Sequence, residues 1–192
     1  MSKTVYYCAT SLDGYIADSD DGIAWLEGYT GRFDGAGVQP IAGSYDDFYD
    51  GVGALVMGSV TYAFVLGEIS SGTSWPYRGK PTWVLSTREL PRLEGDGVDV
   101  RFSSSRVTDL HGELVEAAGE RDLWVVGGGN VASQFADAGL LDEVRLTLVP
   151  VVLGEGKPLF NRGVPAAMQL AEAHPFDNGM VHLRYAVQRG RA

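Results

Sequence analysis

The sequence predicts an α/β domain with a mostly parallel central sheet of about eight strands, flanking helices and a C-terminal antiparallel hairpin. Short runs rich in β-branched and aromatic residues alternate with segments of helical periodicity, which is typical of parallel strands joined by crossover helices. The last part of the chain carries two such runs with no helical pattern between them, which favours an antiparallel pair. The 192 residues contain no linker or internal repeat, so we expect a single domain over residues 1–192.

Eight segments are expected to be strands, and several of them are apolar throughout, as strands covered on both faces are. They are Thr4–Ala9, Ala54–Met57, Thr82–Ser86, Val98–Phe102, Leu123–Val126, Val144–Val149 and the hairpin pair Met168–Ala173 and Met180–Gln188. Helices are expected where an apolar face follows a capping residue. One helix is expected to begin at Thr108 and end before Gly119, and a second to begin at Asn130 and end before Gly139. Two shorter helices are expected over Ser44–Tyr49 and Ser59–Leu66.

Composition excludes several classes of function. The chain has 15 Lys and Arg against 25 Asp and Glu, a formal charge of −10, which argues against nonspecific binding of nucleic acid or anionic membranes. The single cysteine, Cys8, excludes a disulfide framework, and the three histidines lack ligand spacing, so we expect no metal site. We find neither a signal-peptide pattern nor an apolar run of about 18 residues. The expectation is a cytoplasmic protein that acts on a small molecule.

A triple glycine is the strongest local motif. The predicted strand Leu123–Val126 runs into Gly127, Gly128 and Gly129 and then into a helix that begins at Asn130. Glycines let the backbone approach a ligand closely, and the free N–H groups at a helix start bind anions, so a phosphate or pyrophosphate is the natural ligand. A tight turn without a ligand explains the same residues equally well. Neither the G-x-G-x-x-G fingerprint nor a P-loop is present.

Two further strand ends carry groups that suit phosphate. They are Gly58, Ser59 and Thr61 after the strand Ala54–Met57, and Ser86, Thr87 and Arg88 at the end of the strand Thr82–Ser86. Each alone is explained by a capped helix or a solvated arginine. In a parallel sheet, however, all three junctions fall at the carboxyl edge, where ligands bind.

Five motifs in this order resemble the dihydrofolate-reductase-like superfamily, and within it the reductase domain of bacterial riboflavin-biosynthesis bifunctional deaminase/reductases. They are Ser11–Ala17 (SLDGYIA), Met57-Gly58-x-x-Thr61-Tyr62, Leu85–Arg88 (LSTR), Gly127–Val131 (GGGNV) and Pro150–Gly154 (PVVLG). The resemblance extends from Thr4 to Gln188. It implies an NADPH-dependent oxidoreductase that transfers hydride to a pyrimidine or pteridine-like ring, such as 5-amino-6-(5-phosphoribosylamino)uracil. Because the zinc-deaminase pattern H-x-E with P-C-x-x-C is absent, only the reductase half is expected.

The alternatives are a dihydrofolate reductase and a nucleotide-binding module without turnover. The resemblance also implies a homodimer, and it assigns a role to each matching position in cofactor binding. The nicotinamide would meet backbone groups of Ala9 and Ile16. The pyrophosphate would be held from one side by Gly58, Ser59 and Thr61, and from the other by Gly128, Gly129, Asn130 and Val131. The 2′-phosphate would be bound by Ser86, Thr87 and Arg88. A cis peptide bond is expected within Gly127–Gly129.

The acceptor side of the site departs from folate reductases. Ile41–Gly43 stands where they carry a carboxylate, and Asp46 and Asp47 come one turn later, with neither assigned a role. Trp25 would flank the ring, although it also suits a core anchor, and Lys80 lies near the position of their tail-binding arginine. The resemblance and the residue chemistry leave two catalytic candidates. Asp13 near the ring would supply a proton or contact the substrate, and Thr147 would orient an acceptor nitrogen unless it only packs.

Overall fold

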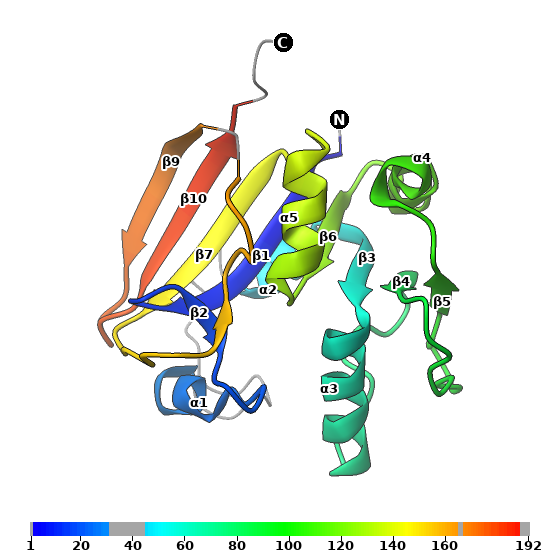
Figure 1. Ribbon diagram of the computed structural model, residues 1–192, viewed down its shortest axis with the longest axis horizontal. Coiled ribbons are helices and arrows are strands. Elements are labelled where there is room, and N and C mark those ends of the chain that lie inside the picture. The colour runs from blue at the N-terminus through cyan, green and yellow to red at the C-terminus, as the bar shows by residue number, and fades with distance from the viewer. Residues whose placement is uncertain (1, 31–44, 165–166, 189–192) are drawn as a thin grey trace.

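A computed structural model describes residues 2–30, 45–164 and 167–188, and confirms the predicted fold class (Figure 1). The central sheet has eight strands in the order β5-β4-β3-β6-β1-β7-β10-β9. In that order, the strands span Val100–Ser103, Thr82–Leu85, Val52–Gly58, Asp122–Val126, Thr4–Ser11, Glu143–Val149, Val181–Val187 and Met168–Pro175. The strands from β5 to β7 pair in parallel. β10 pairs antiparallel with both β7 and β9, which forms the expected C-terminal hairpin.

Four of the helices match predicted ones. They are α2 (Tyr45–Asp50), α3 (Ser59–Ser70), α4 (Val107–Ala118) and α5 (Gly129–Asp137), and the predicted start of α2 at Ser44 lies outside the described residues. The predicted caps are wrong. Thr108 and Asn130 lie inside α4 and α5 as their second residues, and Arg106 and Gly128 occupy the cap positions without a side-chain cap. The Thr108 hydroxyl donates to Asp109, and the Asn130 amide oxygen accepts from Gln134.

Three short elements were not predicted: the helix α1 (Ala24–Thr30) and the two-stranded sheet of β2 (Tyr15–Ala17) and β8 (Lys157–Pro158). A helix of seven residues hardly completes two turns, so its periodicity is weak. The two strands pair across about 140 residues, which no local pattern reveals.

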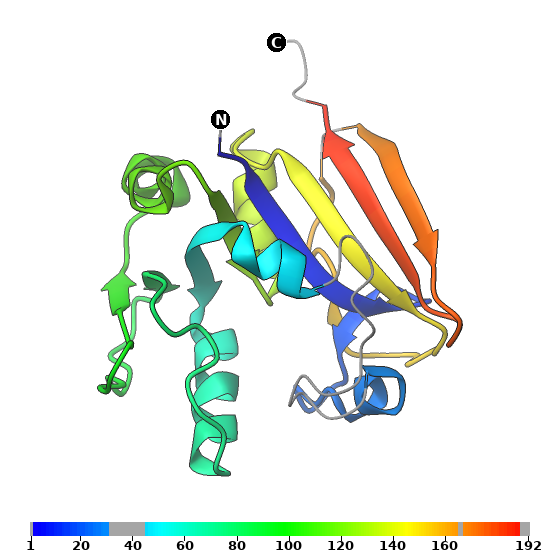
Figure 2. The ribbon, with the colours of Figure 1, turned by 180° about the vertical axis from the view of Figure 1, so that it is seen from behind.

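Apolar cores lie on both faces of the sheet because successive strand residues point to opposite sides. Tyr6 belongs to the core under α4 and α5, whereas its neighbour Val5 belongs to the core under α2 and α3. Figure 2 shows α2 (cyan) in front of the sheet, with α5 behind it. The strands are therefore covered on both sides, which explains their continuous apolar runs.

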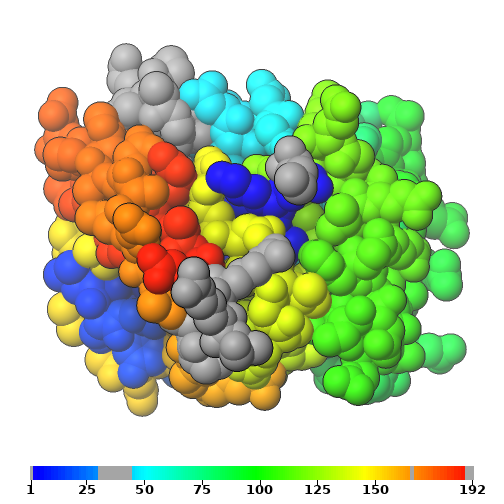
Figure 3. Space-filling view, turned by 90° about the horizontal axis from the view of Figure 1, so that it is seen from above, coloured from blue at the N-terminus to red at the C-terminus, as the bar shows by residue number. Residues whose placement is uncertain are grey.

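The parallel strands end at one edge of the sheet. Met57 pairs with Val126 and Gly58 with Leu85, so the ends of β3, β4 and β6 are neighbours, as expected for the three phosphate-type junctions. In Figure 1 this carboxyl edge points down, and α3 leaves from it. Figure 3 looks onto the opposite, amino edge, where the start of β1 (dark blue) lies beside β7 (yellow). No helix among the described residues is long and apolar enough to cross a membrane.

Candidate cofactor-binding edge

Arg88 and Ser59 meet at the carboxyl edge although 29 positions separate them. The Arg88 Nη2 donates to the Ser59 Oγ at 2.9 Å. Ser86 holds the turn after β4, because its hydroxyl accepts from the Arg88 N–H at 2.9 Å and donates to the Arg88 carbonyl at 3.0 Å. The guanidinium thus lies at the start of α3, where the N-cap Gly58 supplies no side-chain cap. A cation beside the free N–H groups of a twelve-residue helix is suited to bind an anion.

An open pocket of about 570 Å³ adjoins this contact, and its size suits a small-molecule ligand. It is bounded by three segments: the turn after β2, the first two turns of α3 and the loop after β4. The lining residues are Asp20, Asp21, Gly22, Ser59, Val60, Ala63, Phe64, Arg88, Glu89 and Leu90. Thr87 is exposed beside them.

The triple glycine turns against Thr61. Gly127 has φ +72°, and a Cβ there would lie 2.5 Å from the Thr61 Oγ1. The Gly128 N–H donates to the same oxygen at 3.3 Å. On the other side, the Tyr6 hydroxyl lies 3.0 Å from the Gly127 carbonyl oxygen. Thr61 and the glycine turn therefore bring the N-termini of α3 and α5 together.

Gly128 and Gly129 differ in what surrounds them. A Cβ on Gly129 would lie 2.5 Å from the Pro158 carbonyl oxygen and 2.6 Å from that of Leu159, so the chain itself requires this glycine. A Cβ on Gly128 would meet only the Thr61 Oγ1, at 3.8 Å. The expected cis peptide bond is absent from the described residues, because the positive φ of Gly127 makes the turn with trans bonds.

Val131 and Asn130 follow the turn in α5. A Cβ on Gly58 would lie 3.3 Å from the Val131 Cγ2, and Val131 is buried, so this pair locks β3 to α5. The Asn130 side-chain oxygen accepts a hydrogen bond from the Gln134 amide at 2.7 Å.

Asp13 does not have the environment of a proton donor. It accepts hydrogen bonds from the Ser11 hydroxyl at 2.6 Å, the Gly154 N–H at 2.7 Å and the Leu153 N–H at 3.1 Å. The Ser11 hydrogen bond and the two backbone N–H groups hold the pKa of Asp13 below its usual range. The carboxylate therefore ties the loop after β1 to the loop after β7.

Lys80 lies at the wrong edge for the predicted substrate contact. Its Nζ donates to the Tyr49 carbonyl at 2.9 Å and to the Val52 carbonyl at 2.6 Å, and it lies 4.3 Å from the Tyr49 ring centroid. Val52 begins β3 and Gly58 ends it, so about 20 Å separates Lys80 from the carboxyl edge. Lys80 stabilises the connection from α2 to β3.

The nicotinamide end of the predicted site is formed by β1, β2 and α1. Ala9 is half-buried in β1 and Ile16 in β2, and both Ala9 and Trp25 pack against the buried cluster of Leu26, Val149 and Met180. The Trp25 Nε1 is buried without a hydrogen-bond partner in the described part of the chain. An orphaned donor of this kind, on a residue that packs against the same cluster as Ala9, is compatible with a ligand at this end.

Thr147, one of the two predicted catalytic candidates, belongs to a polar group on the sheet beside this end, whose other members, Tyr7 and His182, were not predicted. The Tyr7 hydroxyl lies 3.5 Å from the Thr147 Oγ1, and the Tyr7 ring centroid lies 5.9 Å from that of His182. Only cross-strand register joins Tyr7 and His182 to Thr147, so no local pattern could have found these two residues. Asp46 and Asp47 are exposed on α2, and Ile41–Gly43 lies outside the described residues.

The strand order and the three junctions at the carboxyl edge define a dihydrofolate-reductase-like α/β protein. Residues 3–182 match the RibD C-terminal domain, so the chain belongs to this family. It is 33% identical over 159 residues to the Bacillus subtilis (strain 168) protein YwjB, covering 83% of each chain.

Solved structures agree with this assignment. A "Putative riboflavin biosynthesis protein" from Shewanella sp. PV-4 superposes with a TM-score of 0.80 at 28% identity, covering 97% of this chain and 99% of the other. A dihydrofolate reductase from Enterococcus faecalis, in complex with NADP(H) and RAB-propyl, has a TM-score of 0.57 at 16% identity, covering 97% and 96%. The similarity to the Enterococcus faecalis dihydrofolate reductase concerns the fold alone. Together with the family match, these similarities place the chain in the RibD C-terminal domain family, with a dihydrofolate-reductase-like fold.

Proposed function

We propose that the protein is an NADPH-dependent reductase that transfers hydride to a pyrimidine or pteridine-like ring, of the type reduced in riboflavin biosynthesis. The observation that carries this proposal is the contact of Arg88 with Ser59 beside the pocket at the start of α3. Membership of the RibD C-terminal domain family supports the same reaction class.

The residues at the edge fit this cofactor. The 2′-phosphate would be bound by Arg88, together with Ser86 and Thr87 of the same loop and with Ser59 at the start of α3. A guanidinium forms charge-assisted hydrogen bonds to phosphate oxygens. The N-termini of α3 and α5, which the hydrogen bond between Thr61 and Gly128 brings together, would hold the pyrophosphate, because Gly128 has no Cβ and leaves room for it. The bound cofactor supplies the hydride.

The chain's own part in the reaction is to position the ring and exclude water. Ala9 and Ile16 would orient the nicotinamide through backbone groups, and Trp25 would cover it from α1. Asp13 is held as a carboxylate by its donors, so the proton comes from solvent or from another group on the sheet. The displacement of Lys80 to the amino edge weakens the dihydrofolate reductase alternative.

Titration of the purified protein with NADPH and NADH, followed by quenching of its four tryptophans, tests the cofactor. We expect saturable binding that favours NADPH. An acceptor screen with the riboflavin-pathway pyrimidine and dihydrofolate then measures the loss of NADPH absorbance. Binding of neither nucleotide would refute the proposal, and NADPH binding without turnover on any ring would leave the non-catalytic module. Light scattering of the same sample tests the predicted homodimer.

A further inference from the structure

The connection from β4 to β5 carries Arg88, yet it has no secondary structure of its own. All of residues 86–99 are described, and they form neither a helix nor a strand, although β4 and β5 pair in parallel. Connections of about 12 residues or more without regular structure are uncommon in compact domains and are often functional. The contacts that this loop makes with the rest of the protein therefore decide where the Arg88 guanidinium lies.

The contact between Arg88 and Ser59 is too weak to hold the loop by itself. Arg88 is exposed, and its guanidinium donates to a neutral hydroxyl. A hydrogen bond of this kind hardly offsets the rotamer freedom that an ordered arginine loses. The Ser86 hydroxyl orders the turn before the guanidinium, but it bonds within the loop. The part of the loop beyond Arg88 needs an anchor from another element.

Tyr62 supplies that anchor from α3. Its hydroxyl donates to the Pro91 carbonyl oxygen at 2.8 Å and accepts from the Leu93 N–H at 3.2 Å. One side chain thus uses both its donor and its acceptor on the backbone of the loop. The Tyr62 side chain is fully buried and lies edge-on to Phe102 of β5, with the ring centroids 5.5 Å apart. The hydroxyl is therefore held firmly against the loop.

The anchor and the candidate phosphate contact lie about one helical turn apart. Tyr62 follows Ser59 by three positions in α3, and Pro91 follows Arg88 by three positions in the loop. Residues three apart on a helix are neighbours on its surface, so the two contacts lie side by side. Ser59 and Arg88 line the open pocket, whereas Tyr62 is not one of its lining residues. Tyr62 can therefore act on a ligand there through the loop.

Apolar packing alone does not determine how the loop lies on α3. Leu90 and Leu93 are partly buried against the same apolar cluster as Tyr62. Such contacts have no preferred direction, so a leucine can shift along the cluster at little cost. Hydrogen bonds depend steeply on distance and angle. Burial of the two leucines thus keeps the loop on the core, and the Tyr62 hydroxyl defines its position there.

We propose that Tyr62 is a positioning residue for the 2′-phosphate of the cofactor: its hydroxyl holds the loop after β4 so that Arg88 lies at Ser59 before the nucleotide binds. A cation that is already in place binds more tightly than one that must be ordered on binding. Tyr62 thus contributes to the preference for NADPH over NADH through Arg88. The inference rests on the proposed function, because it needs Arg88 to bind the 2′-phosphate.

Tyr62→Phe tests the proposal, because it keeps the buried ring and removes the hydroxyl alone. NADPH and NADH, which differ only in the 2′-phosphate, are titrated calorimetrically into the wild type and the variant. We expect the variant to bind NADPH about fivefold more weakly and NADH within about twofold of the wild type. Tyr49→Phe is the matched control. The Tyr49 hydroxyl also donates to a proline carbonyl, that of Pro76 at 3.3 Å, but near Lys80 at the amino edge, so its loss should change neither affinity.

A double-mutant cycle with Arg88→Ala separates positioning from a merely structural role. If Tyr62 acts through Arg88, adding Tyr62→Phe to Arg88→Ala should weaken NADPH binding by no more than about twofold. A structural role would instead lower the affinity for both nucleotides in both backgrounds, because partial unfolding removes the whole site. Urea unfolding of each variant checks that the titrated samples are folded.

Three results would overturn the inference alone, in a wild type that prefers NADPH: equal weakening of both nucleotides by Tyr62→Phe, no weakening of NADPH, or losses that add in the double variant. The proposed function would then stand without a role for Tyr62. A wild type that binds neither nucleotide, or that binds both equally well, would overturn the assignment of the 2′-phosphate to Arg88 and the inference with it.

Discussion

Gly127, Gly128 and Gly129 are neighbours in the chain, yet the physical reason for a glycine differs from one position to the next. Gly127 needs its positive φ and would clash with Thr61, and Gly129 makes room for the carbonyl oxygens of β8 and the residue after it. Gly128 has φ −53°, and a Cβ there would make only an ordinary van der Waals contact, 3.8 Å from the Thr61 Oγ1. Only Gly128 thus has an absent side chain that a ligand could use.

Alanine at these positions should separate packing from binding. Gly129→Ala forces a methyl group against backbone oxygens and should reduce the free energy of unfolding by about 3 kcal/mol. Gly128→Ala should leave stability within about 0.5 kcal/mol but weaken NADPH binding. Urea unfolding and nucleotide titration measure the two effects. Equal stability of the two variants would contradict the packing argument.

Arg88 should determine the choice between the two nicotinamide cofactors. Arg88→Ala removes the cation next to Ser59 and should weaken NADPH binding about tenfold or more, with little change for NADH, because only NADPH carries the 2′-phosphate. Isothermal titration with both nucleotides measures this difference. An equal loss for both would remove the 2′-phosphate assignment.

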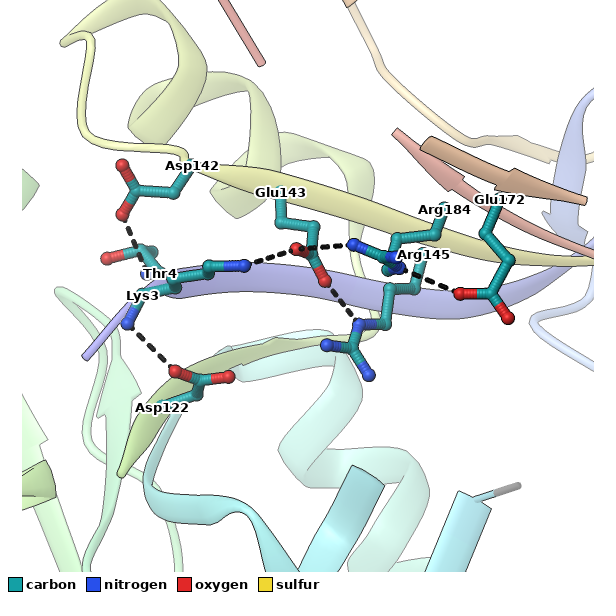
Figure 4. Close-up of polar contacts among 8 residues, drawn as sticks. All are labelled: Lys3, Thr4, Asp122, Asp142, Glu143, Arg145, Glu172 and Arg184. Atoms are coloured by element: carbon teal, nitrogen blue, oxygen red, sulfur yellow. Dashed lines mark hydrogen bonds and ion pairs between the residues drawn. The ribbon is translucent and has the colours of Figure 1, made fainter. Parts of the chain in front are cut away.

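At the scale of elements, Glu143 joins three strands. Its carboxylate on β7 binds Lys3 just before β1, Arg145 on β7 and Arg184 on β10 (Figure 4). The Arg145 guanidinium also lies 5.1 Å from the ring centroid of Phe48, which places α2 over the same network. Burial acts to raise the pKa of Glu143, but the hydrogen bonds from Lys3 and Arg145 and their charges outweigh it and hold the pKa below its usual value.

Glu143→Gln should therefore destabilise the fold by about 2 kcal/mol at pH 7, because it removes the buried carboxylate that pairs with the half-buried Arg145 and with the more exposed Lys3 and Arg184. Because the pKa of Glu143 is lower in the folded state than in the unfolded state, its carboxylate stabilises the protein at pH values above the unfolded-state pKa. This contribution is lost as the pH falls through the folded-state pKa. The wild type should thus lose its advantage over the variant in acid. Urea unfolding from pH 7 to pH 3 measures this, with the exposed Glu116→Gln as the control. A difference that does not change with pH would contradict it.

At the scale of the whole molecule, the candidate cofactor site combines segments from much of the chain, from β1 to the start of α5. A ligand that joins these segments binds only the folded protein and must stabilise all of it. NADPH at about 100 times its dissociation constant should add about 2.7 kcal/mol, which raises Tm by about 5–10 °C for a chain of this size. Calorimetry with and without the nucleotide tests this. No rise in Tm at a concentration that saturates tryptophan quenching would show that the quenching is not due to native-state binding.

Local patterns were enough to predict the α/β class, the eight strands of the central sheet and the three junctions at its carboxyl edge, because these depend on periodicity and on glycines and hydroxyls next to strand ends. Tertiary structure alone decided which groups face which. It placed Lys80 at the amino edge, engaged Asp13 with the loop after β7, and made Gly128 the open glycine. It also aligned Thr147 and His182 with Ala9 across the sheet, because cross-strand register joins residues whose separation in the chain carries no local signal.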